Sequence, residues 1–372
     1  MGPACAPQPV HPTRGAPVLG EVVVYFPHRK VTLPQPRGVV HTVRLKTDNT
    51  WEFFMFRNLS IVGLPLSGRP SELIEMALSF GFDSMDLDLI DFQQQAKVYG
   101  VEHARRLMVS ARLSVGVFAL PVALSGDDET FAADLAALEE RLDLAQQAEA
   151  PRAVATIEPA SDEHAFKDNF ERHRTRLQSI GELLEPRGIS LGLAVNPDPA
   201  ERAEKAHQFL HTLEGLLGLV AVSHQQVGVV VDPFAMHAAG EPLAMIRDIP
   251  EGKIVELRLS DAPGDVPAGE LTKAQRLLPG ETGTIDMVAV LKEAEEAKFD
   301  GCVTPWAARA SITGRGRERI VRLAGDRLIR AWKDAGLPEE PRWFVPVMPE
   351  EAEAAAPTPT PAPAPASADT AS

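Results

Sequence analysis

Two spacings of apolar positions alternate along residues 58–336. Short runs rich in Val, Ile, Leu and Ala are separated by longer stretches in which apolar residues recur every three or four positions. The first pattern is typical of buried strands and the second of helices that cover a sheet. Eight strands are therefore expected, at residues 59–66, 85–90, 114–120, 153–158, 190–195, 227–232, 253–260 and 301–304.

The stretches between these runs predict helices. A helix over residues 71–80 would be capped by Ser71 and ended by Gly81, and others are expected near 135–145, 166–184, 199–217, 286–297 and 317–335. Eight strands alternating with helices over about 280 residues match the count and size of a TIM barrel. The first turn, residues 63–68, lacks the glycine pattern of a doubly wound dinucleotide-binding sheet. We predict an α/β fold, a (β/α)8 barrel at residues 58–340.

Both ends of the chain differ from this pattern. Residues 1–19 are expected to be a flexible leader, and residues 20–57 an N-terminal extension with short strands. Residues 341–372 form a C-terminal segment that becomes rich in Ala, Pro, Thr and Glu from about residue 349. Such a composition buries too little apolar area to offset the entropy of ordering, so this tail is expected to be disordered.

Charge and cysteine content restrict the partners and the compartment. With 37 basic and 52 acidic residues the net charge is −15, which disfavours nucleic acid and anionic membranes as partners. The two cysteines cannot form a disulfide framework, which is typical of a reducing compartment. No run of about 20 apolar residues predicts a membrane helix, and the N-terminus lacks the pattern of a secretory signal. We expect a cytoplasmic protein.

Polar residues that follow the predicted strands are the candidates for chemistry, because barrel active sites lie where strands run into the next loop. Asp86 belongs to strand two, and Glu158 and Asp232 are the last residues of strands four and six. Each has a structural alternative, such as an ion pair to an outer helix or a helix cap. For Asp232 a ligand or a partner is favoured, because a carboxylate at the end of a buried run is costly to leave unpaired.

Arg258 and His237 complete the polar residues near the last strands. In the run Leu257-Arg258-Leu259 the leucines would face the helices, so Arg258 is expected to point into the barrel. A buried guanidinium needs anionic partners. His237 follows strand six and is interpreted either as an ordinary loop residue or as a catalytic one.

Three segments carry a resemblance to a known family. Residues 232–240, 257–263 and 276–286 are similar to the xylose-isomerase-like barrels, usually called sugar phosphate isomerases/epimerases, which include inosose dehydratases and ketose 3-epimerases. The resemblance implies a barrel that acts on a sugar or cyclitol, with a divalent metal at the carboxyl ends of the strands. It also implies substrate-binding roles for Asp261 and Arg276, alongside Asp86 and Arg258.

The metal ligands that the resemblance implies are mostly absent here. They would be a Glu ending strand five, an Asp ending strand six, a His on strand seven and a Glu on strand eight. Ala194, Asp232, Arg258 and the segment 304–306 occupy those places, so Asp232 is the only retained ligand position. An arginine would repel a cation by roughly 4 kcal/mol per unit charge at ~4 Å and an effective dielectric of ~20. We predict no metal; instead Arg258 would pair with Asp232, with Glu158 as a further partner.

Two functions remain open from the sequence. The first is an isomerase or epimerase acting on a small-molecule sugar or cyclitol, with Glu158, Asp232 and His237 as catalytic candidates and Asp86 as a further candidate for the base. The second is a metal-free relative that binds a carbohydrate-like or anionic metabolite, or a protein partner, without turning it over. The sequence leaves the substrate, the oligomeric state and catalytic activity undetermined.

Overall fold

The computed structural model describes residues 55–338 and, before them, four strand segments. These segments are β1 (Val22–Phe26) paired antiparallel with β2 (Arg29–Leu33), and β3 (Arg44–Leu45) paired antiparallel with β4 (Trp51–Glu52). The expected leader at residues 1–19 and the C-terminal segment 341–372 lie outside the described residues. Within the described part, no helix is both long enough and apolar enough to cross a membrane.

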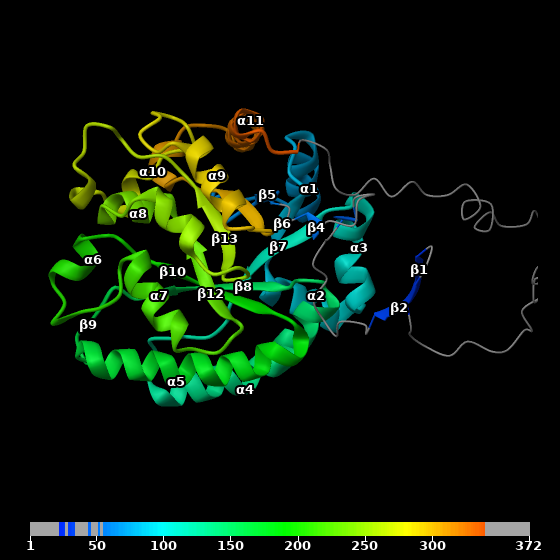
Figure 1. Cartoon of the computed structure of the whole chain (residues 1–372), viewed down its shortest axis with the longest axis horizontal. Helices are drawn as coiled ribbons and strands as arrows, with labels where there is room; N and C mark the ends of the chain where they lie inside the picture. The colour runs from blue at the N-terminus through cyan, green and yellow to red at the C-terminus, as the bar shows by residue number, and fades with distance from the viewer. Residues whose placement is uncertain (1–21, 27–28, 34–43, 46–50, 53–54, 339–372) are drawn as a thin grey trace, which may run out of the picture.

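Eight parallel strands close into a barrel, which confirms the predicted fold (Figure 1). The strands follow chain order around the barrel: β5 (Phe56–Leu59), β6 (Ser84–Leu87), β7 (Ser114–Ala119), β8 (Arg152–Ile157), β10 (Ser190–Val195), β12 (Val227–Val231), β13 (Ile254–Leu259) and β14 (Cys302–Pro305). Pairing of β14 with β5 completes the closure.

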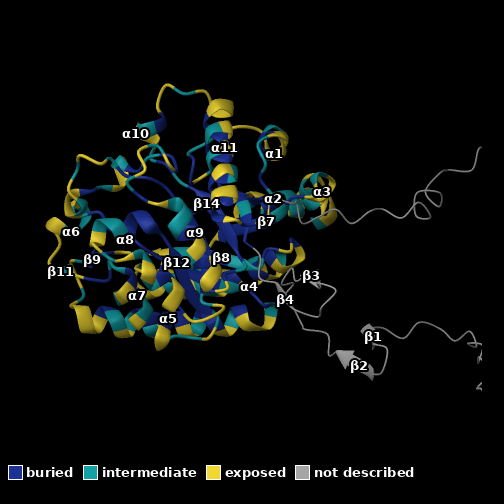
Figure 2. Cartoon of the chain, turned by 45° about the horizontal axis from the view of Figure 1, so that its top comes forward, coloured by how far each residue is buried: buried dark blue, intermediate teal, exposed yellow. Residues whose placement is uncertain are grey.

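Helices surround the barrel (Figures 1 and 2), and the longer ones other than α3 have buried apolar side chains. The longer ones are α1 (Pro70–Ser79), α2 (Leu89–Tyr99), α3 (Val101–Ala111), α4 (Asp128–Gln147), α5 (Phe166–Leu184), α7 (Leu213–Ala221), α9 (Met287–Glu296) and α11 (Arg317–Ala335). Shorter elements lie in the connections: β9 (Ala160–Ser161), α6 (Ala200–Ala203), β11 (His207–Gln208), α8 (Pro233–Ala239) and α10 (Arg309–Ile312), with 3-10 turns η1 (Glu185–Arg187), η2 (Leu243–Asp248), η3 (Ala268–Glu270) and η4 (Lys273–Gln275). Leu138, Leu142 and Leu177 are fully buried, as the helical spacing predicts.

Two predicted elements were wrong. The first barrel strand ends at Leu59, whereas residues 59–66 were expected to be the strand. The chain turns after Leu59 because the Ser60 hydroxyl accepts the Gly63 N–H at 2.9 Å and the Ser60 carbonyl accepts the Leu64 N–H at 3.1 Å. The expected helix at 199–217 is split into α6 and α7. The shift of the first strand places Asn58 at its carboxyl end.

The barrel interior changes from apolar to polar toward the carboxyl ends of the strands. Phe56, Val117 and Cys302 pack together inside the barrel. Two residues further along their strands, Asn58 follows Phe56 and Thr304 follows Cys302, and both are fully buried. Because successive inward residues of a strand are two apart, this polar layer lies directly above the apolar one.

Candidate functional site

Asn58 joins three neighbouring strands inside the barrel. Its Nδ2 donates to Asp86 Oδ1 at 2.7 Å and to Thr304 Oγ1 at 3.1 Å, and its Oδ1 accepts from the Ser84 hydroxyl at 2.9 Å. A Cβ atom on Gly116 of β7 would lie 2.1 Å from this Oδ1, so the position has room only for glycine. The hydrogen bonds hold the Asp86 carboxyl in one orientation.

Asp86 is partly buried near the end of β6. The sequence left two roles open for it, a residue of the site or a structural ion pair. Burial, and then the negative charge of Glu256, raise the pKa of Asp86 to about 7. Hydrogen bonds from Ser60, Asn58 and the Val117 backbone oppose the rise but do not cancel it. A carboxyl that titrates near neutrality can act as a general acid or base.

Arg258 points into the barrel, where it lies between a carboxylate and an indole ring. Its Nε donates to Glu256 Oε2 at 2.9 Å, and its guanidinium carbon is 4.1 Å from the centre of the Trp306 ring. Its η nitrogens make no hydrogen bond to any described residue. Two more buried atoms in this group lack a partner in the described part of the chain, Glu256 Oε1 and Trp306 Nε1. The group therefore retains both donors and an acceptor for a bound molecule.

Asp232 is paired with Arg276, so the predicted pairing with Arg258 was wrong. The Nη1 and Nη2 atoms of Arg276 donate to the two Asp232 oxygens at 2.8 and 2.7 Å. Burial alone would raise the pKa of Asp232, but the charge and hydrogen bonds of Arg276, and then the charge of Arg258, hold it below its ordinary value. The predicted partner Glu158 does not pair with Arg258 either: Glu158 is exposed, and Arg258 pairs with Glu256.

Asp261 organises the loop that carries Arg276. Its two carboxylate oxygens accept four backbone N–H groups, from Ala262, Thr282, Gly283 and Ile285, at 2.7–3.0 Å. These bonds outweigh the effect of burial and keep the pKa of Asp261 below its ordinary value. Its expected substrate-binding role stays a prediction; in the structure it fixes the loop.

The other two catalytic candidates lie outside this hydrogen-bonded group. Glu158 follows β8 and is exposed, and His237 is half-buried in the last turn of α8. Neither side chain makes a hydrogen bond to a described residue. The charge of Glu158 contributes to the raised pKa of Lys205 and of Lys273, after the hydrogen bonds of those lysines to Asp162 and Glu201.

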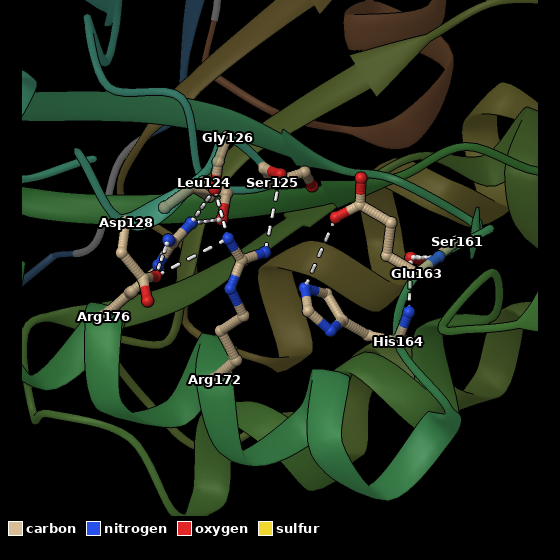
Figure 3. A network of polar contacts seen from close by, with 9 residues as sticks. All are labelled: Leu124, Ser125, Gly126, Asp128, Ser161, Glu163, His164, Arg172 and Arg176. Carbon is tan, nitrogen blue, oxygen red and sulfur yellow. Dashed lines mark hydrogen bonds and ion pairs between the residues drawn. The ribbon is translucent and has the colours of Figure 1, made fainter. Parts of the chain in front are cut away.

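The loop after β7 is fixed by two arginines of α5 (Figure 3). Arg176 Nη1 donates to the carbonyls of Leu124 and Gly126, both at 2.7 Å, and its Nη2 donates to Asp128 at 2.6 Å. Arg172 donates to the Gly126 carbonyl as well. Because Arg176 is buried, these contacts fix the loop at the carboxyl end of the barrel rather than form a basic surface.

The residues at the expected ligand positions do not fit a divalent metal. Ala194 and Thr304 supply no charged donor, Arg258 is a cation, and both Asp232 oxygens accept hydrogen bonds from Arg276. Among the described residues there is no group of three or more His, Cys, Asp and Glu that could hold an ion.

Asn58 and Glu256 are site residues that were not predicted from the sequence. Glu256 stands two positions before Arg258, so the same alternation that placed Arg258 inside the barrel also predicts an inward Glu256. Asn58 was not predicted because the apolar run from Leu59 to Leu66 indicates a strand that begins after it, whereas the first strand is Phe56–Leu59.

Two proteins with similar sequences are inosose isomerases. Over 153 to 174 residues the chain is 25% identical to an inosose isomerase of Halalkalibacterium halodurans and 30% identical to one of Bacillus velezensis. These alignments span 46% and 41% of this chain, and only 59% and 51% of the relatives.

Solved structures share the fold. A xylose isomerase domain protein from Alicyclobacillus acidocaldarius superposes with a TM-score of 0.70 at 21% identity, covering 76% of this chain and 100% of the other. The IOLI protein with a bound zinc atom superposes with a TM-score of 0.65 at 18% identity, covering 76% of this chain and 99% of the other. The family model for the xylose isomerase-like TIM barrel matches residues 74–322. This chain therefore belongs to the family of xylose isomerase-like TIM barrels.

Proposed function

We propose that this protein is a metal-independent sugar or cyclitol isomerase or epimerase, in which Arg258 takes the electrophilic role that the family gives to a cation. The observation that carries the proposal is the arrangement of Arg258: fixed by Glu256, stacked on Trp306, and with η N–H groups that no described residue accepts. A planar guanidinium can bind the oxygens of a substrate bidentately.

The chemistry of such a site requires stabilisation of negative charge on a carbonyl oxygen. When a proton leaves the carbon next to a carbonyl, the electrons move onto that oxygen. A fixed cation in a water-poor site stabilises this charge without reorganisation. The relatives named as inosose isomerases support a polyhydroxylated ring or chain as the substrate class.

Binding without turnover is the alternative, and one observation favours it. Asp232, the retained ligand position, is held as an anion by Arg276, so it is a poor base. On this alternative the protein would bind a carbohydrate-like molecule through Arg258 and leave it unchanged. In either case the proposed partner is a small molecule rather than nucleic acid or membrane, in line with the net charge of −15, and the proposed location is the cytoplasm.

Solvent deuterium exchange separates the two proposals. Purified protein treated with a chelator is incubated in heavy water with a panel of ketoses and inososes, and incorporation at carbon is measured by mass spectrometry. Metal-independent catalysis predicts incorporation that Arg258→Met reduces at least tenfold. The control is Arg174→Met, which removes an exposed arginine of α5. A ligand-induced thermal shift without any incorporation would support binding alone, and activity only after metal addition would refute the proposal.

A further inference from the structure

We propose that Asp86, held by Asn58 on the side of the barrel that carries Arg258, removes and returns the proton on the substrate carbon beside the carbonyl. This inference rests on the proposed function and assigns the proton-transfer group within it. Of the candidates that the sequence offers for proton transfer, it selects Asp86 over Glu158, Asp232 and His237.

The position of Asp86 supports this assignment. The strands β13, β14, β5 and β6 are consecutive in the barrel, and they present Arg258, Thr304, Asn58 and Asp86 at the same end. Asn58 bonds to both Thr304 and Asp86, and Thr304 is the register partner of Arg258. The carboxyl is therefore fixed on the same side of the barrel as the cation that would stabilise the enolate.

The other carboxylates of the site are already engaged. Asp232 accepts two hydrogen bonds from Arg276, and Asp261 accepts four from the backbone. Glu256 is fully buried, with one oxygen on Arg258 and the other without a partner among described residues. Asp86 is only partly buried, which leaves it accessible to a small molecule.

The surroundings of Asp86 keep its carboxyl weakly acidic. It faces the charge of Glu256 on β13 and the Val117 N–H on β7. The neutral groups of Asn58 on β5, and of Ser60 just after that strand, donate hydrogen bonds to it. On β14 the buried thiol of Cys302 has a pKa well above its ordinary value and is uncharged at neutral pH. Glu256 is thus the one nearby group of the described chain whose charge raises the pKa of Asp86.

In the proposed step Asp86 alone accepts and returns the proton. The Asp86 carboxylate takes a proton from the carbon, the C–H electron pair becomes the C=C bond of an enolate, and the carbonyl π pair moves onto the oxygen held by Arg258. When Asp86 returns the same proton, or a solvent deuteron, to that carbon, the step is reversed and exchange is observed. In a substrate with a hydroxyl on that carbon, return of the proton to the former carbonyl carbon gives the isomer: the hydroxyl proton moves to the enolate oxygen, and the hydroxyl oxygen forms the new C=O bond. No oxidant or metal is consumed.

The test combines exchange kinetics with a titration that needs no substrate. Asp86→Asn should lower deuterium incorporation at least 100-fold, whereas the matched change Asp88→Asn, at the exposed cap of α2, should leave it unchanged. In wild-type protein the incorporation rate should rise with pH through about 7, because the carboxylate is the active form. Glu256→Gln should move this midpoint to lower pH, since it removes the negative neighbour.

Infrared difference spectroscopy reports the carboxyl directly. A carboxylic-acid band should disappear near pH 7 in wild-type protein, be absent in Asp86→Asn, and shift to lower pH in Glu256→Gln. A band titrating only in the ordinary aspartate range, near pH ~4, overturns the inference whatever the activity. Exchange that survives in Asp86→Asn overturns the assignment of Asp86 but leaves the proposed function standing, and absence of exchange in wild-type protein overturns both.

Discussion

The Asp232–Arg276 pair offers a quantitative test of the site's electrostatics. Both side chains are more than nine-tenths buried and are joined by two hydrogen bonds of 2.8 and 2.7 Å. Replacing Arg276 by Met keeps a side chain of similar length but leaves the Asp232 charge without its partner. Removing one member of a buried ion pair costs about 3–5 kcal/mol, so Arg276→Met should lower the free energy of unfolding by that amount.

A second variant separates the charge from the packing. Asp232→Asn combined with Arg276→Met removes both charges, and the Asn can still cap α8, where Asp232 accepts the Phe234 and Ala235 N–H groups. We expect the double variant to recover about half or more of the loss. Urea unfolding monitored by circular dichroism gives the free energies, with Arg174→Met as an exposed control expected to change stability by less than ~1 kcal/mol.

The pH dependence has a defined sign. In wild-type protein the pKa of Asp232 is held below its ordinary value, so its contribution to stability is present above that value and is lost as the pH falls through the folded-state pKa. In Arg276→Met the main cause of this lowering is gone and burial favours the protonated acid. The deficit of the variant should therefore be larger at pH 7 than near pH 4. A loss no greater than that of Arg174→Met, or a double variant as unstable as the single one, would refute the reasoning.

Three further predictions concern the surroundings of the site. Gly116→Ala should destabilise the protein by about 1–3 kcal/mol and move the pH midpoint of exchange, because its Cβ would displace Asn58. Arg176→Met should cost about 1–3 kcal/mol and increase hydrogen exchange in the loop after β7, since it leaves the Leu124 carbonyl without its donor and the Gly126 carbonyl with Arg172 alone. Burial lowers the pKa of His173 to about 4, so stability should fall as the pH drops below ~6.5, by at most about 3 kcal/mol, and less in His173→Phe.

Each of these predictions has a result that would contradict it. An unchanged midpoint in Gly116→Ala would mean that Asn58 does not tune Asp86. Wild-type exchange rates for the loop in Arg176→Met would show that α5 is not what fixes it. Identical acid sensitivity of the wild-type protein and His173→Phe would exclude His173 as the titrating group.

Local sequence patterns were sufficient for the architecture. The apolar runs gave the number and order of the barrel strands, and the alternation Leu257-Arg258-Leu259 placed Arg258 inside the barrel. Both results depend on how often apolar residues recur, every second residue in a strand and every three to four in a helix. A short stretch of sequence is enough to show this spacing. The one misplaced barrel strand, at residues 59–66, arose because apolar residues in a turn resemble those in a strand.

Tertiary structure alone decided which charges meet. Arg276 is 44 positions from Asp232, and Asn58 is 246 positions from Thr304, so no local pattern relates them. The sequence therefore predicted that Asp232 needs a cation but assigned it Arg258, whereas the closed barrel gives that carboxylate to Arg276 and leaves Arg258 with Glu256. The physical reason is that burial makes a partner obligatory, while the choice of partner depends on strand register and loop path across the whole chain.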